Sequence, residues 1–246
     1  MIRRIQALNY RCLRYADVTL DRFHVLVGPN ASGKSTLLDV VAFLGDVVSE
    51  GLVEAVEKRT RNFQDLVWKR PAKDLGFELA VEFTVPDALK QQLPREKSFE
   101  LFRYEIAIRE DSGTIRIDSE RGLLIPSGRS AAAAQQVLRF PDPPEVPATI
   151  LLGGGRPGSR TILSKSREGR DNFNIEVSKQ AGKGWTIAIS FGPARSTLGN
   201  LPESPDTFPV STRRNDCSWT AFECASPVHR SGGGRRSSPT APTFPR

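Results

Sequence analysis

Residues 28–35, near the N-terminus, have the types and the spacing of a phosphate-binding loop. They read Gly-Pro-Asn-Ala-Ser-Gly-Lys-Ser and fit the pattern G-x-x-x-x-G-K-[ST]. In such a loop the backbone amides converge on a phosphate, the lysine reaches the β- and γ-phosphates, and the hydroxyl after it holds Mg²⁺. We predict a nucleotide site with Ser35 as the metal ligand, and we identify no candidate catalytic residue. The predicted nucleotide-binding residues are Gly28, Pro29, Asn30, Ala31, Ser32, Gly33, Lys34, Ser35 and Thr36.

The segments on either side of this loop fit the same chemistry. Residues 23–27, Phe-His-Val-Leu-Val, form a short and mostly apolar run, which is typical of a buried parallel strand. After the loop, a helix that begins at about Lys34 is predicted by apolar residues at helical spacing: Leu37, Val40, Val41, Leu44, Val47 and Val48. The N-terminus of this helix would contribute unsatisfied N–H groups and the positive end of the helix dipole to the phosphate site. The alternative is a glycine-rich turn with an exposed lysine, and the strand–loop–helix context favours the nucleotide site.

Much of the chain up to about residue 190 alternates apolar and polar residues as strands do. This pattern predicts strands at 2–8, 18–21, 75–85, 99–109, 114–118, 172–177 and 185–190. Asp111-Ser112-Gly113 predicts a tight turn. We therefore expect a mostly antiparallel β lobe over 75–190, inserted after a phosphate-loop core at 1–50. Residues 54–66 have mixed helical character, and 127–146 is predicted to be a loop with one short helix at 131–138.

The composition narrows the class of protein. The net charge of +7 permits contact with nucleic acid, although the scattered basic residues favour a solvated, mildly basic surface. Cys12, Cys217 and Cys224 are odd in number and lack C-x-x-C spacing, so neither a disulfide framework nor a zinc site is expected. Only His24 and His229 are available to a histidine-based catalytic site. No stretch approaches the ~20 apolar residues that span a bilayer, and the N-terminus lacks the apolar region of a signal peptide. We expect a cytoplasmic protein with no membrane partner.

Two segments before residue 40 combine into a specific family pattern. Asn9-Tyr10-Arg11 fits an N-[FY]-R element, and residues 27–39 fit V-G-P-N-x-S-G-K-S-T-L-L-D. Together they resemble AAA family ATPases of the ABC/SMC/RecF type, a group that includes the OLD-like (overcoming-lysogenization-defect) proteins. Residues 102–126 are similar to the antiparallel lobe of these proteins, and the resemblance covers roughly residues 1–210. It implies an α/β P-loop NTPase fold, an ABC-ATPase-like head with an inserted antiparallel β lobe, of which residues 1–198 are the N-terminal part.

The resemblance also implies cofactors and partners. ATP and Mg²⁺ would lie between two heads of a head-to-head homodimer, and an intact relative would couple to DNA or to an effector protein. Hydrolysis would need an Asp-Glu pair after an apolar strand, and the nearest run, residues 106–111, is interrupted by Arg109. Residues 152–156 are similar to a signature loop, but Pro157 prevents the helix that should follow. The resemblance thus implies an ATPase, and we expect this chain to be incomplete for turnover.

The character of the chain changes beyond about Gly199. Seven of the 18 prolines and two of the three cysteines lie in the last 48 residues, where we predict a disordered Arg/Ser/Pro-rich tail over 199–246. Two origins stay open: a natural tail, or a frameshift that begins between about Gly199 and Asp216. The codons permitted for 237–245, read out of phase, can spell Leu-Pro-Asp-Gly-Ser-Asn-Leu-Pro, which looks like a segment of the family.

Two other functions stay open beside ATP binding. A small-molecule P-loop kinase would need an Arg-rich lid after the loop, whereas Arg11, Arg14 and Arg22 precede it. A nucleic-acid-binding module without catalysis would use the basic surface, and its affinity should fall steeply with salt.

Overall fold

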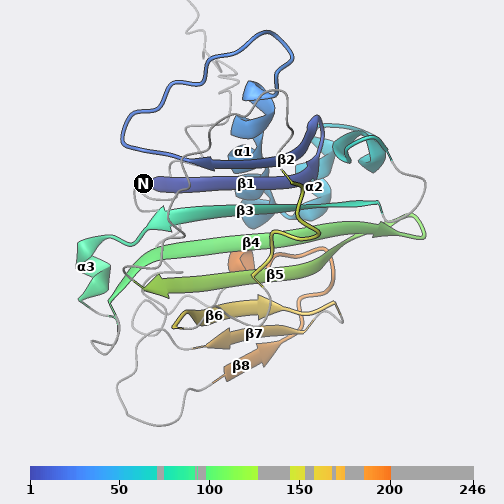
Figure 1. The fold of residues 1–246 in the computed structure, drawn as a ribbon. Coiled ribbons are helices and arrows are strands. Elements are labelled where there is room, and N and C mark those ends of the chain that lie inside the picture. The colour runs from blue at the N-terminus through green and yellow to red at the C-terminus, as the bar shows by residue number, and fades with distance from the viewer. Residues whose placement is uncertain are drawn as a thin grey trace, which may run out of the picture.

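The computed structural model describes residues 1–70, 75–91, 93, 98–126, 145–152, 158–167, 170–174 and 186–200. Within these residues eight strands form one sheet in the order β2-β1-β3-β4-β5-β6-β7-β8 (Figure 1). All neighbouring strands are antiparallel, as predicted for residues 75–190. The strands are β1 Ile2–Tyr10, β2 Leu13–Thr19, β3 Gly76–Thr84, β4 Phe99–Asp111, β5 Thr114–Pro126, β6 Arg160–Lys165, β7 Asp171–Asn174 and β8 Thr186–Ile189.

Five helical segments accompany the sheet in the part of the chain that the structure describes. They are α1 Lys34–Ser49, α2 Leu52–Glu57, η1 Phe63–Leu66, α3 Asp87–Lys90 and η2 Leu198–Asn200. The long helix α1 begins at Lys34, as predicted, and lies behind β1 and β2 in Figure 1. No helix among the described residues has the length and apolar character that crossing a membrane requires.

The main core lies between α1 and one face of the sheet. On β3 the alternate residues Phe77, Leu79, Val81 and Phe83 all point into it, because successive side chains of a strand face opposite sides. The helix contributes its apolar stripe, which was read from the sequence: Leu37, Val40, Val41, Leu44 and Val47 are buried there together with Phe43. The hydrophobic periodicity of helix and strand therefore fixes which side of the sheet the helix covers.

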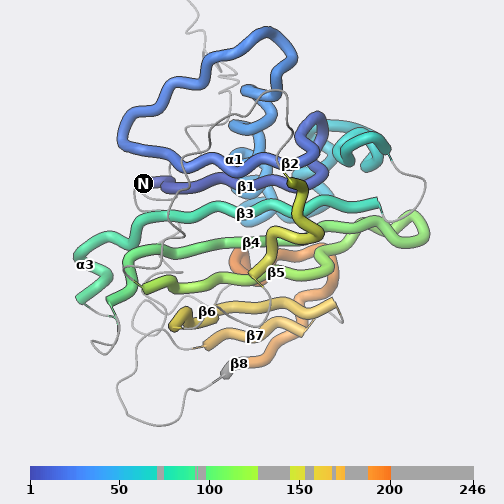
Figure 2. The backbone as a smooth tube through the Cα atoms, in the orientation of Figure 1, coloured from blue at the N-terminus to red at the C-terminus, as the bar shows by residue number. Residues whose placement is uncertain are grey.

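The opposite face of the sheet carries buried polar side chains beside a small apolar cluster of Leu8, Ala80 and Ile150, and residues 145–152 cross it. Figure 2 shows this segment passing over β3, β4 and β5. The side chain of Arg103 is buried below it and donates hydrogen bonds to Glu105, Glu82 and Gln6 at 2.7–2.9 Å. Arg103 also donates to the carbonyl oxygen of Ile150 at 2.8 Å. A buried guanidinium that is paired with carboxylates and makes four hydrogen bonds in this way ties the crossing segment to the sheet.

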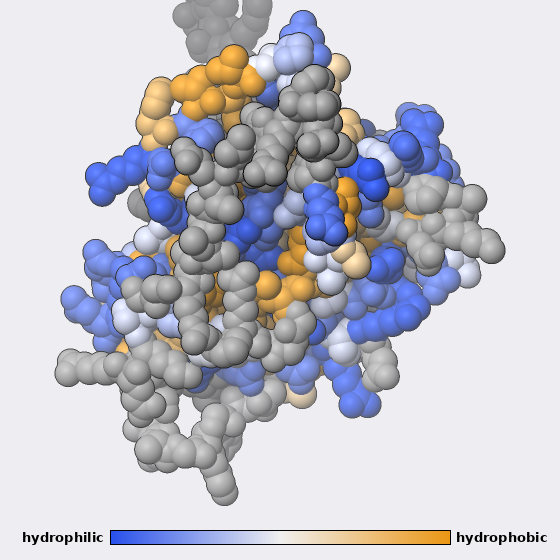
Figure 3. Space-filling model, in the orientation of Figure 1, coloured by the Kyte–Doolittle hydropathy of each residue, from blue (hydrophilic) through white to orange (hydrophobic). Residues whose placement is uncertain are grey.

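One predicted strand is wrong. Residues 23–27 form no strand, and the side chains of Phe23, Val25 and Val27 are 84%, 61% and 88% exposed. An apolar strand of this kind needs neighbours at its edges and cover on its faces. Within the described residues every strand of the sheet is antiparallel and none pairs with 23–27, so the segment runs as an exposed loop from β2 to α1. Apolar residues gather at the upper edge of Figure 3, over this loop.

Other predictions differ only in their boundaries. The strand expected at 18–21 is β2, at Leu13–Thr19, because a tight turn at residues 11–12 lets it pair with β1 almost immediately. The turn after Asp111 has positive φ at Ser112 and Gly113, which suits a two-residue hairpin, and β5 continues to Pro126. The predicted helix at 131–138, residues 153–156 of the signature-like loop and the tail beyond 200 lie outside the described residues.

Candidate functional site

The loop 28–33 leads directly into the N-terminus of α1. The helix has 16 residues, Gly33 precedes it with φ 90°, and no side chain caps its first turn. No acidic residue lies in that turn either. The first N–H groups of a helix have no partners within it, so a capping group or an anion normally satisfies them. Here the positive end of the helix dipole is available to an anionic ligand at the loop.

The side chain of Lys34 lies across the loop. Its Nζ atom donates to the carbonyl oxygens of Gly28 at 2.7 Å and Pro29 at 2.6 Å, and to the Ser32 hydroxyl at 3.2 Å. These acceptors are neutral, and a phosphate oxygen offers the ammonium a stronger charge-assisted bond. The structure therefore places the predicted lysine at the mouth of the loop, within reach of any group bound there.

The two glycines of the motif occupy positions where a side chain is restricted. A Cβ atom on Gly28 would lie 2.9 Å from the Ser32 hydroxyl oxygen and 3.9 Å from the Lys34 Nζ. Gly33 has a positive φ, which other residues adopt only with strain. Between them, residues 29–32 are exposed, as is Ser35, the predicted metal ligand. The predicted residues thus form one contiguous, accessible loop.

A cavity of about 480 Å³ lies beside the start of α1 and was not predicted from the sequence. It is open to solvent and lies between two turns: residues 9–12 at the end of β1, and residues 67–70 after η1. Backbone hydrogen bonds join them, from Arg11 N to Leu66 O at 2.8 Å and from Trp68 N to Asn9 O at 2.9 Å. The cavity is lined by Arg11, Cys12, Thr36, Asp65, Val67, Lys69 and Arg70.

Backbone strain gathers around this cavity. Asn9, Arg11, Lys69 and Arg70 have φ values of 59°, 51°, 55° and 44°, in the left-handed region that non-glycine residues seldom adopt. Such conformations cost of order 1–3 kcal/mol each and are concentrated at ligand sites. The turns are further held by Trp68, whose ring lies under the Lys69 ammonium at 4.5 Å. Only the Asn9-Tyr10-Arg11 element gave a signal for this region in the sequence.

Asp39, on the second turn of α1, joins the loop helix to the first of these turns. Its carboxylate accepts hydrogen bonds from the Tyr10 hydroxyl at 2.7 Å, from Arg11 at 2.9 Å and from Arg59 at 2.8 Å. Burial of the Tyr10 ring, reinforced by the nearby Asp39 carboxylate, raises the pKa of Tyr10 well above its usual value. The hydroxyl therefore remains a hydrogen-bond donor, and both cationic partners neutralise Asp39.

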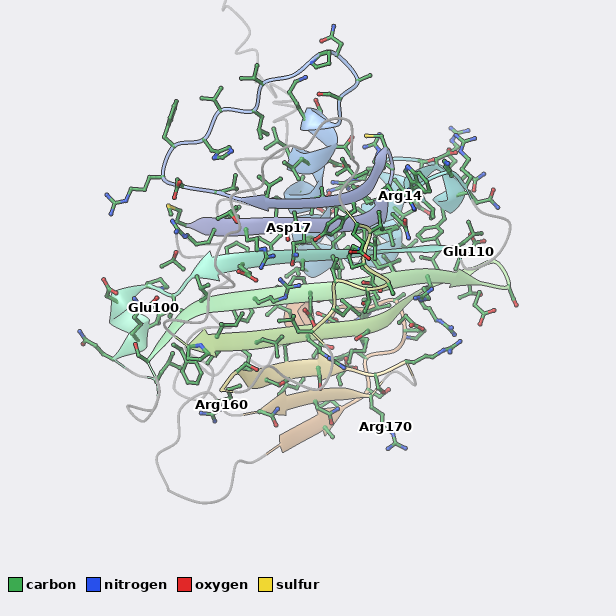
Figure 4. The ribbon with its side chains drawn as sticks, in the orientation of Figure 1. Arg14, Asp17, Glu100, Glu110, Arg160 and Arg170 are labelled. Atoms are coloured by element: carbon green, nitrogen blue, oxygen red, sulfur yellow. The ribbon has the colours of Figure 1, made fainter. Side chains whose placement is uncertain are left out.

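The turn between β1 and β2 also touches the loop itself. The Cys12 Sγ lies 3.2 Å from the Thr36 Oγ1, and a Cβ atom on Gly33 would meet the Leu13 Cδ2 at 2.9 Å. Arg14, labelled on β2 in Figure 4, lies over the Trp68 ring at 5.2 Å. The described part of the chain thus brings together three segments distant in sequence: the loop, the β1–β2 turn and residues 65–70.

Comparison with known proteins places the chain in a family. A family model described as an AAA ATPase domain matches residues 1–125, half of the 246-residue chain, and the chain belongs to this family of ATPase domains. The matched part includes the loop, α1 and both turns of the cavity.

Two other proteins are similar to parts of this chain. The OLD nuclease of Thermus scotoductus is 44% identical to this chain over 48 residues. That match covers 19% of this chain and 9% of the nuclease, so the chain matches only a small part of the length of this relative. A solved structure from work on ATP-driven dimerization and DNA-stimulated activation of SMC ATPases is 18% identical, with a TM-score of 0.31. The match covers 46% of this chain and 70% of the chain in that SMC ATPase structure.

Proposed function

We propose that residues 1–198 form the N-terminal part of a P-loop ATPase head, and that this chain binds ATP with Mg²⁺ through residues 28–36. One observation carries the proposal: a helix of 16 residues begins without a cap, directly after a glycine-containing loop whose lysine lies at its mouth. Loop amides and helix N–H groups would surround the phosphates, and Lys34 would turn from the loop carbonyls to the phosphate oxygens. Ser35, exposed at the first turn, would hold Mg²⁺.

The cavity beside α1 is our candidate for the base and ribose. It adjoins Thr36, the residue after the predicted metal ligand, so a nucleotide with its phosphates at the loop could extend into it. Its volume of about 480 Å³ lies within the ordinary range of small-molecule sites. Of the cations in its lining, Arg11 contacts Asp39 at 2.9 Å and Arg70 contacts Asp65 at 2.8 Å, so the charge that suits a polyanionic ligand is chiefly that of Lys69.

We propose binding, without turnover, as the activity of this chain by itself. Phosphoryl transfer to water needs a group that positions the attacking water near the γ-phosphate. Among the described residues, no carboxylate bonds to any residue of the loop, and Asp39 is occupied by Tyr10, Arg11 and Arg59. Turnover would then depend on groups from another polypeptide or from residues beyond those described.

Replacement of Lys34 tests the proposal. In a titration of the purified chain with a fluorescent ATP analogue and Mg²⁺, we expect Lys34→Ala to bind at least a hundredfold more weakly than the parent, because a charge-assisted bond to phosphate is lost. Lys90→Ala removes an equal charge from α3, where the ammonium contacts Asp87, and should bind as the parent does. Equal affinities of the Lys34→Ala and Lys90→Ala variants, with unchanged melting curves, would exclude the loop as the site.

A further inference from the structure

Another cavity lies at the other end of the sheet, over β5, β6 and β7. It has a volume of about 480 Å³, and its lining includes Ser119, Arg121, Ser164, Arg167 and Asn172. Strands β3, β4 and β5 separate β6 from β1, and neighbouring strands lie about 4.8 Å apart. The cavity is therefore about 20 Å from the turn of β1 and β2 that touches the phosphate loop, too far for one nucleotide to occupy both.

The register of the strands explains why polar groups meet there. Arg121 pairs with Ser164, and Ser164 pairs with Asn172, so the three side chains lie side by side on one face. The neighbouring row, which includes Lys165 and Asp171, points to the opposite face. The ammonium of Lys165 and the carboxylate of Asp171 are fully buried there at 2.6 Å, so the cation of Lys165 is already neutralised.

The charge available in the cavity comes from two guanidinium groups. Arg121 donates from its Nη1 to the carbonyl oxygen of Leu152 at 2.7 Å, which orients its plane; among the described residues, its other N–H groups stay available to a ligand. Arg167 has a side chain that is 69% exposed, and its Nε lies 3.4 Å from the carboxylate of Asp118. That contact is long for a hydrogen bond, and one Asp118 oxygen is buried without a hydrogen-bond partner.

The carboxylate of Asp118 does not make the cavity acidic. Besides Arg167, the guanidinium groups of Arg109 at 3.4 Å and Arg116 at 3.6 Å neutralise it. Arg116 also contacts Asp111 at 3.4 Å, so four arginines, including Arg121, lie near two carboxylates in this cluster. Further arginines, Arg160 and Arg170, lie at the two ends of this part of the sheet (Figure 4).

We propose that this cavity binds a phosphate group carried on a ligand of nucleotide size. Guanidinium groups, serine hydroxyls and an asparagine amide are the side chains that contact phosphate oxygens in proteins, and the paired N–H groups of arginine match their geometry. The volume exceeds what a bare anion fills and lies in the range of small-molecule sites. Two kinds of ligand carry such a phosphate group: a nucleic-acid strand, through its phosphodiester units, or a free phosphate compound.

Binding of a fluorescein-labelled single-stranded oligonucleotide, followed by anisotropy at several salt concentrations, tests the proposal. We expect Arg167→Gln to weaken binding about tenfold and to reduce the slope of log K against log salt by about one, because one phosphate contact is lost. Arg3→Gln is the matched control: it removes the same charge from β1, where Arg3 contacts the exposed Asp21 at 3.6 Å. A second variant, Arg121→Gln, should also weaken binding. Its melting curve is measured as well, to show that the variant is folded.

Competition with pyrophosphate distinguishes the two sources. An oligonucleotide that binds and is displaced by pyrophosphate points to the nucleic-acid backbone. Binding of pyrophosphate alone, with the same loss in Arg167→Gln, points to a free phosphate compound. Both measurements are made in the Lys34→Ala background, in which the phosphate loop no longer competes for pyrophosphate, so an effect of Arg167→Gln there belongs to this cavity. Equal affinities of Arg167→Gln and Arg3→Gln, or no binding of either probe, would overturn the proposal.

Discussion

Gly33 holds a backbone conformation that suits glycine alone, and so does Gly113 in the β4–β5 turn. Their φ values are 90° and 81°. Alanine at either position costs about 1 kcal/mol because of the positive φ. At Gly33 the new Cβ would also meet the Leu13 Cδ2, the end of a side chain that can rotate away, whereas nothing lies within 4 Å of it at Gly113.

We therefore predict similar losses of stability but different effects on binding. Gly33→Ala and Gly113→Ala should each lower the free energy of unfolding by about 1 kcal/mol, measured in urea. Only Gly33→Ala should weaken binding of the fluorescent ATP analogue, because it shifts the N-terminus of α1. If Gly113→Ala weakened binding equally, the effect would come from stability and not from the loop.

Asp17 on β2 gives a prediction about pH. Its carboxylate accepts hydrogen bonds from Arg4 at 2.7 Å, from Gln6 at 3.0 Å and from Tyr15 at 3.2 Å. Burial acts to raise the pKa of Asp17, but the bonds and the charge of Arg4 outweigh burial, so the pKa is lowered. A carboxylate whose pKa is lower in the folded state contributes stability above its unfolded value of about 3.9, and this contribution is lost as the pH falls through the folded pKa.

Asp17→Asn should accordingly be less stable than the parent near neutral pH and approach it in acid. We expect a difference of about 1–2 kcal/mol at pH 7, reduced because the pair is partly exposed, and a smaller difference below about pH 3.5. Urea unfolding of both proteins across this range measures it. A difference that stays constant with pH would mean that the ionised carboxylate does not contribute.

At the scale of elements, the segment 23–27 stands out because its apolar side chains are exposed to solvent. Three of its apolar side chains are more than half exposed, and within the described residues its backbone pairs with no strand. Apolar side chains that lie exposed together on a surface promote association between chains. We predict that Val25→Lys together with Val27→Lys lowers concentration-dependent light scattering without lowering the melting temperature. Val40→Lys, which places a charge in the core, should unfold the protein. Unchanged scattering in the double variant would contradict this interpretation.

The same segment marks where sequence reasoning succeeds and where it fails. Period-two alternation located β3 and β4 within a residue or two, because each strand places one face in the main core. An apolar run such as 23–27 forms a strand only where neighbouring strands can pair with it. Whether such strands are present depends on the rest of the fold and cannot be read from the run itself. The cavity beside α1 escaped prediction for a related reason, because it joins Arg11 to Lys69 across more than fifty residues of sequence.

At the scale of the molecule, residues 190–200 return from the far edge of the sheet to the loop helix. Along this path Phe191 N donates to Asp171 on β7 at 2.8 Å, and Ile117 N on β5 donates to Pro193 O at 2.8 Å. The segment ends in η2, where Leu198 joins the core against α1. This connection links the two ends of the sheet, since β8 and β2 are its opposite edges.

Glu120 on β5 is the anchor of this return path. Its buried carboxylate accepts hydrogen bonds from the Tyr104 hydroxyl at 2.9 Å, the Ser196 hydroxyl at 2.7 Å, and the amides of Thr197 at 2.7 Å and Leu198 at 3.1 Å. Thr197 is held a second time, through its hydroxyl, by Asp171. Glutamine in place of Glu120 would present an NH₂ group to donors that need an acceptor, which leaves buried N–H or O–H groups unsatisfied.

We predict that Glu120→Gln lowers the free energy of unfolding by about 2 kcal/mol, and that Glu57→Gln, an exposed carboxylate on α2, changes it by less than about 0.5 kcal/mol. Hydrogen exchange gives the sharper measurement. If Glu120 connects the edges of the sheet, the amides of Thr197 and Leu198 should exchange much faster in Glu120→Gln, and protection at the C-terminal end of α1 should fall with them. Faster exchange at 197–198 alone would show that the segment is only locally attached and that α1 is stable without it.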